Sequence, residues 1–207
     1  METNLEREAQ IYANLMAEIK GRTLIVKDMI NRLSDVQEQT HENLVQAECA
    51  VLQTRIITEL IALSALTAHS PFGLTKDLLK SWNADKTFRM LEDVNPDCFP
   101  VALKPITAKV GNTHFDRLEG QITRQELAKI YERCGEMLHR GVLKHVLNGK
   151  RKILDLDIIA EAIERIIALL NCHAIVLLQQ NTVLITFMGA PGEDIRVTVA
   201  EATIPAQ

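Results

Sequence analysis

Aromatic residues are scarce in this chain of 207 residues, where they make up 4% of the sequence and include a single tryptophan. A hydrophobic core must therefore be built mainly from the aliphatic members of the 47% of residues that are hydrophobic. An excess of positive charge is also missing, because the formal net charge is −4. This balance argues against a general nucleic-acid binder, which usually has a basic surface, but it is compatible with a local basic patch.

Several common motifs are absent as well. The four cysteines are widely spaced and form no CxxC pair, so the sequence predicts neither a zinc site nor a redox motif. There is no glycine loop of the phosphate-binding type, and we expect no metal and no cofactor. The N-terminal segment lacks the apolar stretch of a signal peptide, and no uninterrupted apolar run approaches the ~20 residues of a membrane span. We therefore expect a cytoplasmic protein that does not contact a membrane.

Apolar residues recur at helical spacing along most of the chain, which predicts amphipathic helices. The predicted helices span residues 5–33, 43–69, 75–92, 123–148 and 154–170. The fourth of them begins with a capping box, formed by Thr123 and Glu126. Gly21 is a candidate for a bend in the first helix. Prolines between residues 94 and 122 interrupt the pattern and predict irregular or extended structure there.

Short β-branched segments separated by turn residues follow residue 171, and they predict a small antiparallel meander. The sequence thus predicts a mainly α fold, a helical bundle with a small C-terminal antiparallel β-meander. We expect the bundle over residues 1–171 and the β appendage over residues 172–207. The appendage should pack on the bundle, so that the two parts form a single structural unit.

Arg133 and His139 stand out within the predicted fourth helix, separated by five residues. Histidine titrates near neutral pH and can transfer a proton, whereas arginine is a permanent cation that can bind a phosphate with two parallel hydrogen bonds. On an ideal helix the two residues lie about 120° apart, so they do not share one face. Either Gly135 distorts the helix between them, or two copies of the helix form the site together across a two-fold axis. The alternative is a solvated helix face in which Glu136 pairs with Arg140.

Arg55 and Glu59 lie in the most apolar predicted helix, close in sequence to Glu48. Charged residues that are buried in such a helix must be paired. One interpretation is a structural ion pair within the helix. The other places these residues beside Arg133 and His139, where they would hold a phosphate or orient the histidine.

A cluster of basic residues follows the motif and could contact RNA phosphates. Its members are Arg140, Lys144, Lys150, Arg151 and Lys152. The alternative is that these cations complement the negative end of a helix dipole and a solvated turn. Trp82 is expected to pack in the core or at a subunit contact rather than to stack on a base.

Arg133 to His139, on a late helix of a small helical bundle, resembles the HEPN superfamily (higher eukaryotes and prokaryotes nucleotide-binding), whose hallmark is an arginine, four to six residues and a histidine. Four segments resemble uncharacterised bacterial HEPN-like proteins: the residues around Arg55 and Glu59, residues 82–85, the proline-rich break at residues 95–100, and residues 131–139. The resemblance covers roughly residues 44–147.

The resemblance implies a homodimer in which the Arg/His motifs of two chains face each other. It implies metal-independent cleavage of RNA by attack of the 2′-hydroxyl on the adjacent phosphate, with Arg133 and His139 as catalytic residues. Glu48, Arg55, Glu59, Tyr131 and Glu136 would support them. Active relatives often belong to toxin–antitoxin or phage-defence systems, so a cognate antitoxin or another protein partner is expected. Cys134 stands where active members often carry Asn, Asp or His. The alternative is therefore a non-catalytic dimeric helical module that binds a partner protein or a nucleotide.

Overall fold

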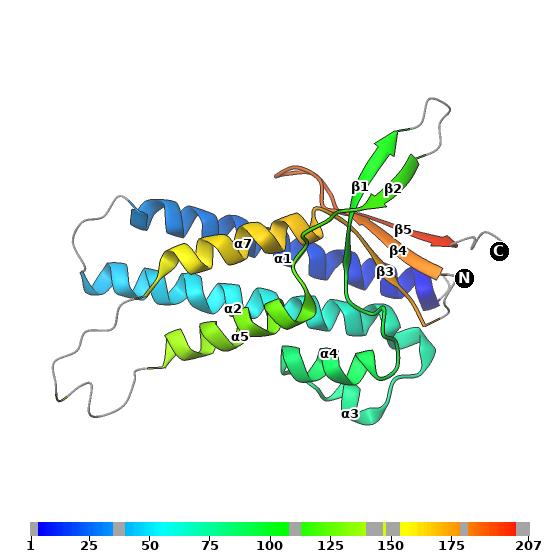
Figure 1. The fold of residues 1–207 in the computed structure, drawn as a ribbon, viewed down its shortest axis with the longest axis horizontal. Coiled ribbons are helices and arrows are strands. Elements are labelled where there is room, and N and C mark those ends of the chain that lie inside the picture. Colours follow the sequence, from blue (N-terminus) through cyan, green and yellow to red (C-terminus); the bar gives the residue numbers. More distant parts are fainter. Residues whose placement is uncertain are drawn as a thin grey trace.

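The structure, a computed structural model, describes residues 4–34, 40–107, 113–139, 147, 154–178 and 182–201. Helices dominate it, and one antiparallel sheet lies at one end (Figure 1). The helices are α1 (Asn4–Ser34), α2 (His41–His69), a 3-10 turn (Ser70–Phe72), α3 (Lys76–Leu79), α4 (Ala84–Glu92), α5 (Arg124–Leu138) and α7 (Leu156–Leu170). The strands are β1 (Val101–Thr107), β2 (Thr113–Arg117), β3 (Cys172–Val176), β4 (Thr182–Phe187) and β5 (Arg196–Glu201). The predicted mainly α fold with a C-terminal β-meander is confirmed.

α2 is the central helix, because α1, α4, α5 and α7 all contact it. Its buried residues are largely alanine, leucine, isoleucine and valine. The segment His41–Phe72 is long and apolar enough to cross a membrane by composition, but 61% of its most apolar window is buried inside the protein. A buried core helix passes the same test of length and composition, so packing inside the protein accounts for the apolar character of α2.

The sheet has the strand order β2-β1-β3-β4-β5, with every neighbouring pair antiparallel. The predicted meander forms β3 to β5, but the sheet also includes a hairpin, β1 and β2, from the segment expected to be irregular or extended. Pro105 lies in β1 opposite Phe115 of β2. β1 pairs with β3 only at Val101 and Ala102. Proline has no backbone N–H to donate, and Pro105 lies in the part of β1 that has a partner strand on one side only.

Two predicted helices have the wrong extent. The segment expected to be one helix over residues 75–92 forms α3 and α4 instead, and Asn83 begins α4 by accepting a hydrogen bond from the backbone N–H of Lys86 at 2.9 Å. The helix expected to reach residue 148 ends at Leu138, and His139 is its C-cap with an extended backbone (φ −68°, ψ 137°). α1 runs without interruption through Gly21.

Candidate functional site

The motif residues Arg133 and His139 lie at the exposed C-terminal end of α5. Leu127, Tyr131, Cys134 and Met137 form the buried side of α5, so Arg133, five residues before the last residue of the helix, points to the solvent side. An Arg133 nitrogen lies 3.3 Å from a Glu136 carboxylate oxygen, and both side chains are more than half exposed. Such an exposed pair contributes little to stability, and it leaves the guanidinium free to bind another anion.

His139 is the C-cap of α5, and its backbone decides where its side chain leaves the helix. Its backbone N–H donates to the carbonyls of Gly135 and Glu136, while its ψ of 137° turns the chain that follows away from the helix axis. Its φ of −68° is helical, so its Cβ still lies where a continuing helix would place it, about 120° around the axis from Arg133. The two side chains of one chain therefore do not share a face, and of the two arrangements the sequence left open, only a site formed by two copies of the helix would bring an arginine and a histidine together.

Arg55 joins α2 to α5. Its guanidinium donates a hydrogen bond to the Tyr131 hydroxyl at 2.8 Å and lies 4.4 Å from the centre of the Tyr131 ring. It also pairs with Glu59 at 3.4 Å within α2. A methyl group at Gly135 would approach an Arg55 nitrogen to 2.9 Å. Gly135 therefore gives the arginine room to lie against α5, rather than distorting the helix.

Among the expected supporting residues, Arg55, Glu59 and Tyr131 are thus brought together in an α2–α5 contact. Glu136 is the ion-pair partner of Arg133, whereas the sequence analysis expected it to support the catalytic residues or to pair with Arg140. Glu48 is half-buried on α2. The expected RNA-contacting cluster, Arg140, Lys144, Lys150, Arg151 and Lys152, lies outside the described residues.

The cysteine inside the motif is a core residue. Cys134 is fully buried, and burial raises the pKa of its thiol to about 12, although Arg55 acts in the opposite direction. A thiol with such a pKa is protonated at neutral pH and is a poor nucleophile. Cys134 therefore fills space between α5 and its neighbours, and it contributes no reactive group to the exposed side of the helix.

The N-terminal half of α5 is fixed by ion pairs to two other helices. Arg124 pairs with Asp85 of α4 at 2.9 Å and lies 2.8 Å from Glu92. Arg165 of α7 pairs with Glu126 at 2.7 Å, and this arginine together with the Thr123 cap lowers the pKa of Glu126 to about 2. These contacts hold the beginning of α5 and leave its C-terminal end exposed.

Sequence reasoning assigned no role to two histidines that prove to be central to the fold. His173 of β3 accepts a hydrogen bond from the Tyr12 hydroxyl of α1 at 2.6 Å, because its other ring nitrogen donates to the Leu170 carbonyl. Burial lowers the pKa of His173 to about 4 and raises that of Tyr12. No local signal could have paired these residues, which are 161 positions apart.

His69 has a similar position at the end of α2. One ring nitrogen donates to the Ala65 carbonyl at 2.7 Å, and the other accepts from the Asn95 amide at 2.8 Å. The same amide also donates to the carbonyl of Val176 in β3. Burial lowers the pKa of His69, so this neutral histidine connects α2 to the sheet.

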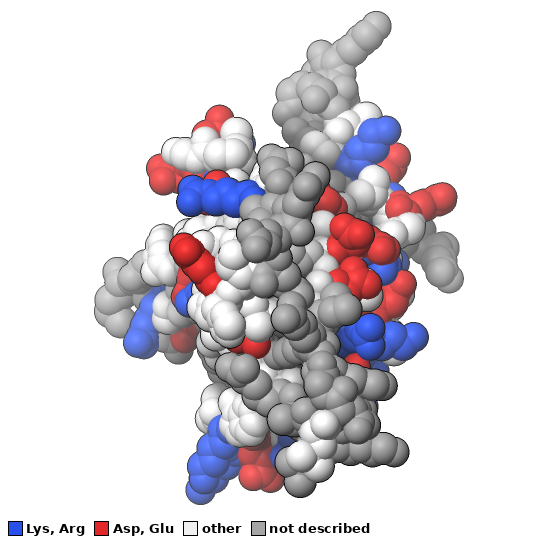
Figure 2. Space-filling model, turned by 90° about the vertical axis from the view of Figure 1, so that its left-hand side faces the viewer, with Lys and Arg blue, Asp and Glu red and all other residues white. Residues whose placement is uncertain are grey.

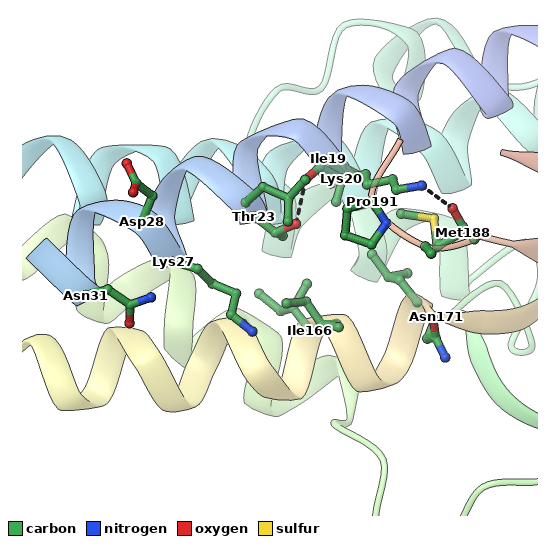
Figure 3. Close-up of a pocket in the computed structure, with 15 residues that line it drawn as sticks. Ile19, Lys20, Thr23, Lys27, Asp28, Asn31, Ile166, Asn171, Met188 and Pro191 are labelled. Atoms are coloured by element: carbon green, nitrogen blue, oxygen red, sulfur yellow. Dashed lines mark hydrogen bonds between the residues drawn. The ribbon is translucent and has the colours of Figure 1, made fainter. Parts of the chain in front are cut away.

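A groove of about 640 Å³ lies elsewhere, between α1, α7 and the β4–β5 connection (Figure 3). Ile19, Ile166 and Met188 contribute to its apolar lining. Its lysines already have partners: Lys20 donates to the carbonyls of Met188 and Glu193, and Lys27 pairs with Glu164. Neither Arg133 nor His139 lines this groove.

Charge on the end of the molecule that carries the C-terminal end of α5 is mixed. Among the described residues in this view, blue and red side chains are interspersed with uncharged ones (Figure 2). On α5 itself, Lys129 and Arg133 alternate with the exposed Glu132 and Glu136. The described residues at this end therefore form no broad basic surface.

Groups of metal-binding side chains are not found in the part of the chain that the structure describes. The chain itself was compared with protein families, with curated proteins and with solved structures. None of the three comparisons finds a match.

Proposed function

We propose that this protein is a HEPN-like endoribonuclease whose catalytic residues are Arg133 and His139. The observation that carries the proposal is that both side chains are exposed at the end of α5 while the rest of the motif is used for packing. Tyr131, Cys134 and Met137 hold the helix, so the remaining polar groups are available to a substrate. We place the protein in the cytoplasm, with a helical-bundle fold of HEPN type.

In this proposal His139 accepts the proton of an RNA 2′-hydroxyl as its oxygen attacks the neighbouring phosphorus. Arg133 stabilises the negative charge that develops on the phosphate oxygens. The bond to the 5′-oxygen breaks, and that oxygen takes a proton from a water molecule as it leaves. The products are a 2′,3′-cyclic phosphate and a 5′-hydroxyl, and no metal ion takes part.

An exposed apolar stripe on α2 supports a homodimer. Val45, Cys49, Leu52, Ile56 and Leu63 fall within about 40° of one line along an ideal helix. Val45, Leu52 and Leu63 are 62%, 42% and 44% exposed, although other sides of the helix are buried. Apolar surface of this kind marks a contact with another macromolecule. Arg55 also lies on α2 and contacts α5, so the stripe and the Arg133/His139 motif lie on neighbouring helices.

The dimer can be tested without any assumption about the substrate. Leu52→Glu places a charge in the stripe and should shift the protein to monomers in light-scattering measurements. Leu79→Glu is a matched control, because Leu79 is also exposed but lies on α3. A Leu52→Glu protein that keeps the oligomeric state of the wild type would contradict a dimer through this stripe.

The shared site has its own test, in which inactive chains are mixed. Arg133→Ala and His139→Ala should each lose RNA cleavage. If each site takes its arginine from one chain and its histidine from the other, mixed dimers contain one intact site and recover activity. No recovery after subunit exchange would contradict a site assembled in this way. Cleaved ends with a 2′,3′-cyclic phosphate would identify the reaction, and wild-type cleavage by His139→Ala would remove that residue from the mechanism.

The second candidate is a non-catalytic dimeric module that binds a partner protein, such as an antitoxin, or a nucleotide. It is favoured by the acidic neighbours of Arg133, since Glu132 and Glu136 oppose the approach of a phosphate. Induced expression in a bacterial host separates the two. Growth arrest that disappears in the soluble, dimeric His139→Ala variant supports the nuclease. A protein that dimerises and cleaves no RNA supports the binding module.

A further inference from the structure

Trp82 is the one exposed aromatic residue of the chain. The five phenylalanines and two tyrosines are buried or half-buried, whereas the Trp82 side chain is 75% exposed. Of the two positions expected for Trp82, in the core or at a subunit contact, the exposure excludes the core. Within the described residues its ring makes no hydrogen bond and no ring contact. The fold therefore does not depend on this indole.

The short segment that carries Trp82 is held at both ends. Ser81 donates its backbone N–H to the Leu78 carbonyl at the end of α3, and its hydroxyl accepts a hydrogen bond from Thr87 at 2.7 Å. Asn83 caps α4 through the backbone N–H of Lys86. Trp82 thus sits on a fixed backbone between α3 and α4 (Figure 1), so little backbone entropy is lost when a ligand stacks on it.

The surface around Trp82 combines a hollow with positive charge. The hollow has a volume of about 640 Å³ and is lined by Trp82, Lys80, Lys86, Asn83, Ser81, Met90 and Asp77. Lys80 and Lys86 are exposed, and no ion pair with a described residue holds either of them. A third exposed lysine, Lys76, precedes them on α3. An aromatic face beside unpaired lysines is the combination with which proteins bind single-stranded nucleic acids.

We infer that this surface binds single-stranded RNA, with a base stacked on Trp82 and the flanking phosphates on Lys80 and Lys86. The choice of RNA rests on the proposed function, but the contact itself does not require cleavage. Asp85 of α4 pairs with Arg124 at the beginning of α5, whereas His139 follows its end. The stacking site and the catalytic motif are therefore separated by roughly the length of α5, about 20 Å. An RNA that touches both must be several nucleotides long.

Trp82 itself reports on this contact, because it is the only tryptophan. In the His139→Ala protein, a 12-nucleotide single-stranded RNA should quench its emission saturably. Anisotropy of the same RNA, labelled with a dye, should show that Trp82→Ala weakens binding about 5- to 100-fold, as expected for one lost stacking contact, whereas Trp82→Phe retains most of the affinity. Each of Lys80→Ala and Lys86→Ala should reduce the slope of log affinity against log salt by about 0.7. Lys104→Ala, an exposed lysine on β1, is the matched control and should leave the slope unchanged.

Three results would overturn the inference. RNA binding without quenching would place the RNA elsewhere. A blue shift with anionic phospholipid vesicles but no response to RNA would make the patch a membrane-binding surface. Loss of the dimer in Trp82→Ala with unchanged RNA affinity would make it a subunit contact. Failure of the nuclease proposal alone gives a different result. RNA still quenches the Trp82 emission, and Trp82→Ala still weakens RNA binding, but the wild type does not cleave RNA.

Discussion

His173 and His139 place the same imidazole in opposite settings. His173 is fully buried, both of its ring nitrogens have partners, and burial holds its pKa near 4. His139 is exposed at the end of α5, where only its backbone N–H contributes to the fold. The comparison teaches that a strongly shifted pKa marks structural groups in this protein. The groups available for chemistry lie at the surface.

The same contrast separates two arginines. Arg55 is bound by Tyr131 and Glu59 and lies over Gly135, so it joins α2 to α5. Arg133, on the opposite side of α5, has one exposed ion pair at 3.3 Å. Both were candidates for phosphate binding in the sequence, and Arg133 is the more accessible of the two, with 53% of its side chain exposed against 28% for Arg55.

The largest effect that sharpens this comparison is loss of stability in mild acid. The pKa of His173 is about 4 in the fold, against an ordinary value of 6.5. Between these values the unfolded chain binds a proton that the folded chain does not, so stability falls as pH falls from 6.5 towards 4. The loss is about 2 kcal/mol between pH 7 and pH 5 and about 3 kcal/mol in full, and His69 adds to it in the same direction.

Urea unfolding at pH 7 and pH 5 measures this loss of stability. Both pH values lie above the pKa of about 2 at which Glu126 of the folded protein takes up a proton. Equal stability of the wild type at the two pH values would contradict a neutral, buried His173.

A smaller effect is expected from Tyr12→Phe. The change removes the hydroxyl that donates to His173 and leaves a buried ring nitrogen without a partner. We expect a loss of about 2 kcal/mol in the free energy of unfolding at pH 7. Ser34 offers a control, because its exposed hydroxyl also makes one hydrogen bond, to the Ile30 carbonyl. Ser34→Ala should change the free energy of unfolding by less than about 0.5 kcal/mol. A similar loss in both variants would show that the buried Tyr12–His173 hydrogen bond stabilises the fold no more than an exposed one.

The smallest effect concerns the packing of Arg55 on Gly135. Alanine is about 1 kcal/mol better than glycine inside a helix, but in the wild type its methyl group would meet the guanidinium at 2.9 Å. Gly135→Ala should therefore be nearly neutral alone and stabilising by about 1 kcal/mol when Arg55 is already alanine. Thermal unfolding of the two single variants and the double variant gives this coupling. Additive effects would mean that Arg55 does not rest on Gly135.

Helices and their caps could be predicted from the sequence, because their signals are local. The capping box of Thr123 and Glu126 is present, and α1, α2 and α7 lie within a few residues of the expected ranges. The remaining elements depend on contacts between segments that are distant in the sequence, or on competition between neighbouring signals. The β1–β2 hairpin was missed because Pro105 tolerates a strand only where one side is unpaired. The division between α3 and α4 depends on Asn83, whose capping role competes with continuation of a helix.

The candidate site was predictable only in part. The sequence singled out Arg133 and His139, and the structure leaves both exposed. It could not show that Arg55 would contact Tyr131, which is 76 positions away, or that Trp82 would be exposed. Long-range contacts and burial depend on the whole fold, and no periodicity in one segment encodes them.

The most direct test of the contrast between interior and surface is to measure RNA cleavage and unfolding together in His139→Ala. The account predicts that cleavage falls by about 10²–10⁴-fold, as expected when a general acid–base group is lost. The free energy of unfolding should stay within about 0.5 kcal/mol of the wild type, as for an exposed residue. Wild-type cleavage by His139→Ala, or a loss of stability comparable with that of Tyr12→Phe, would contradict it.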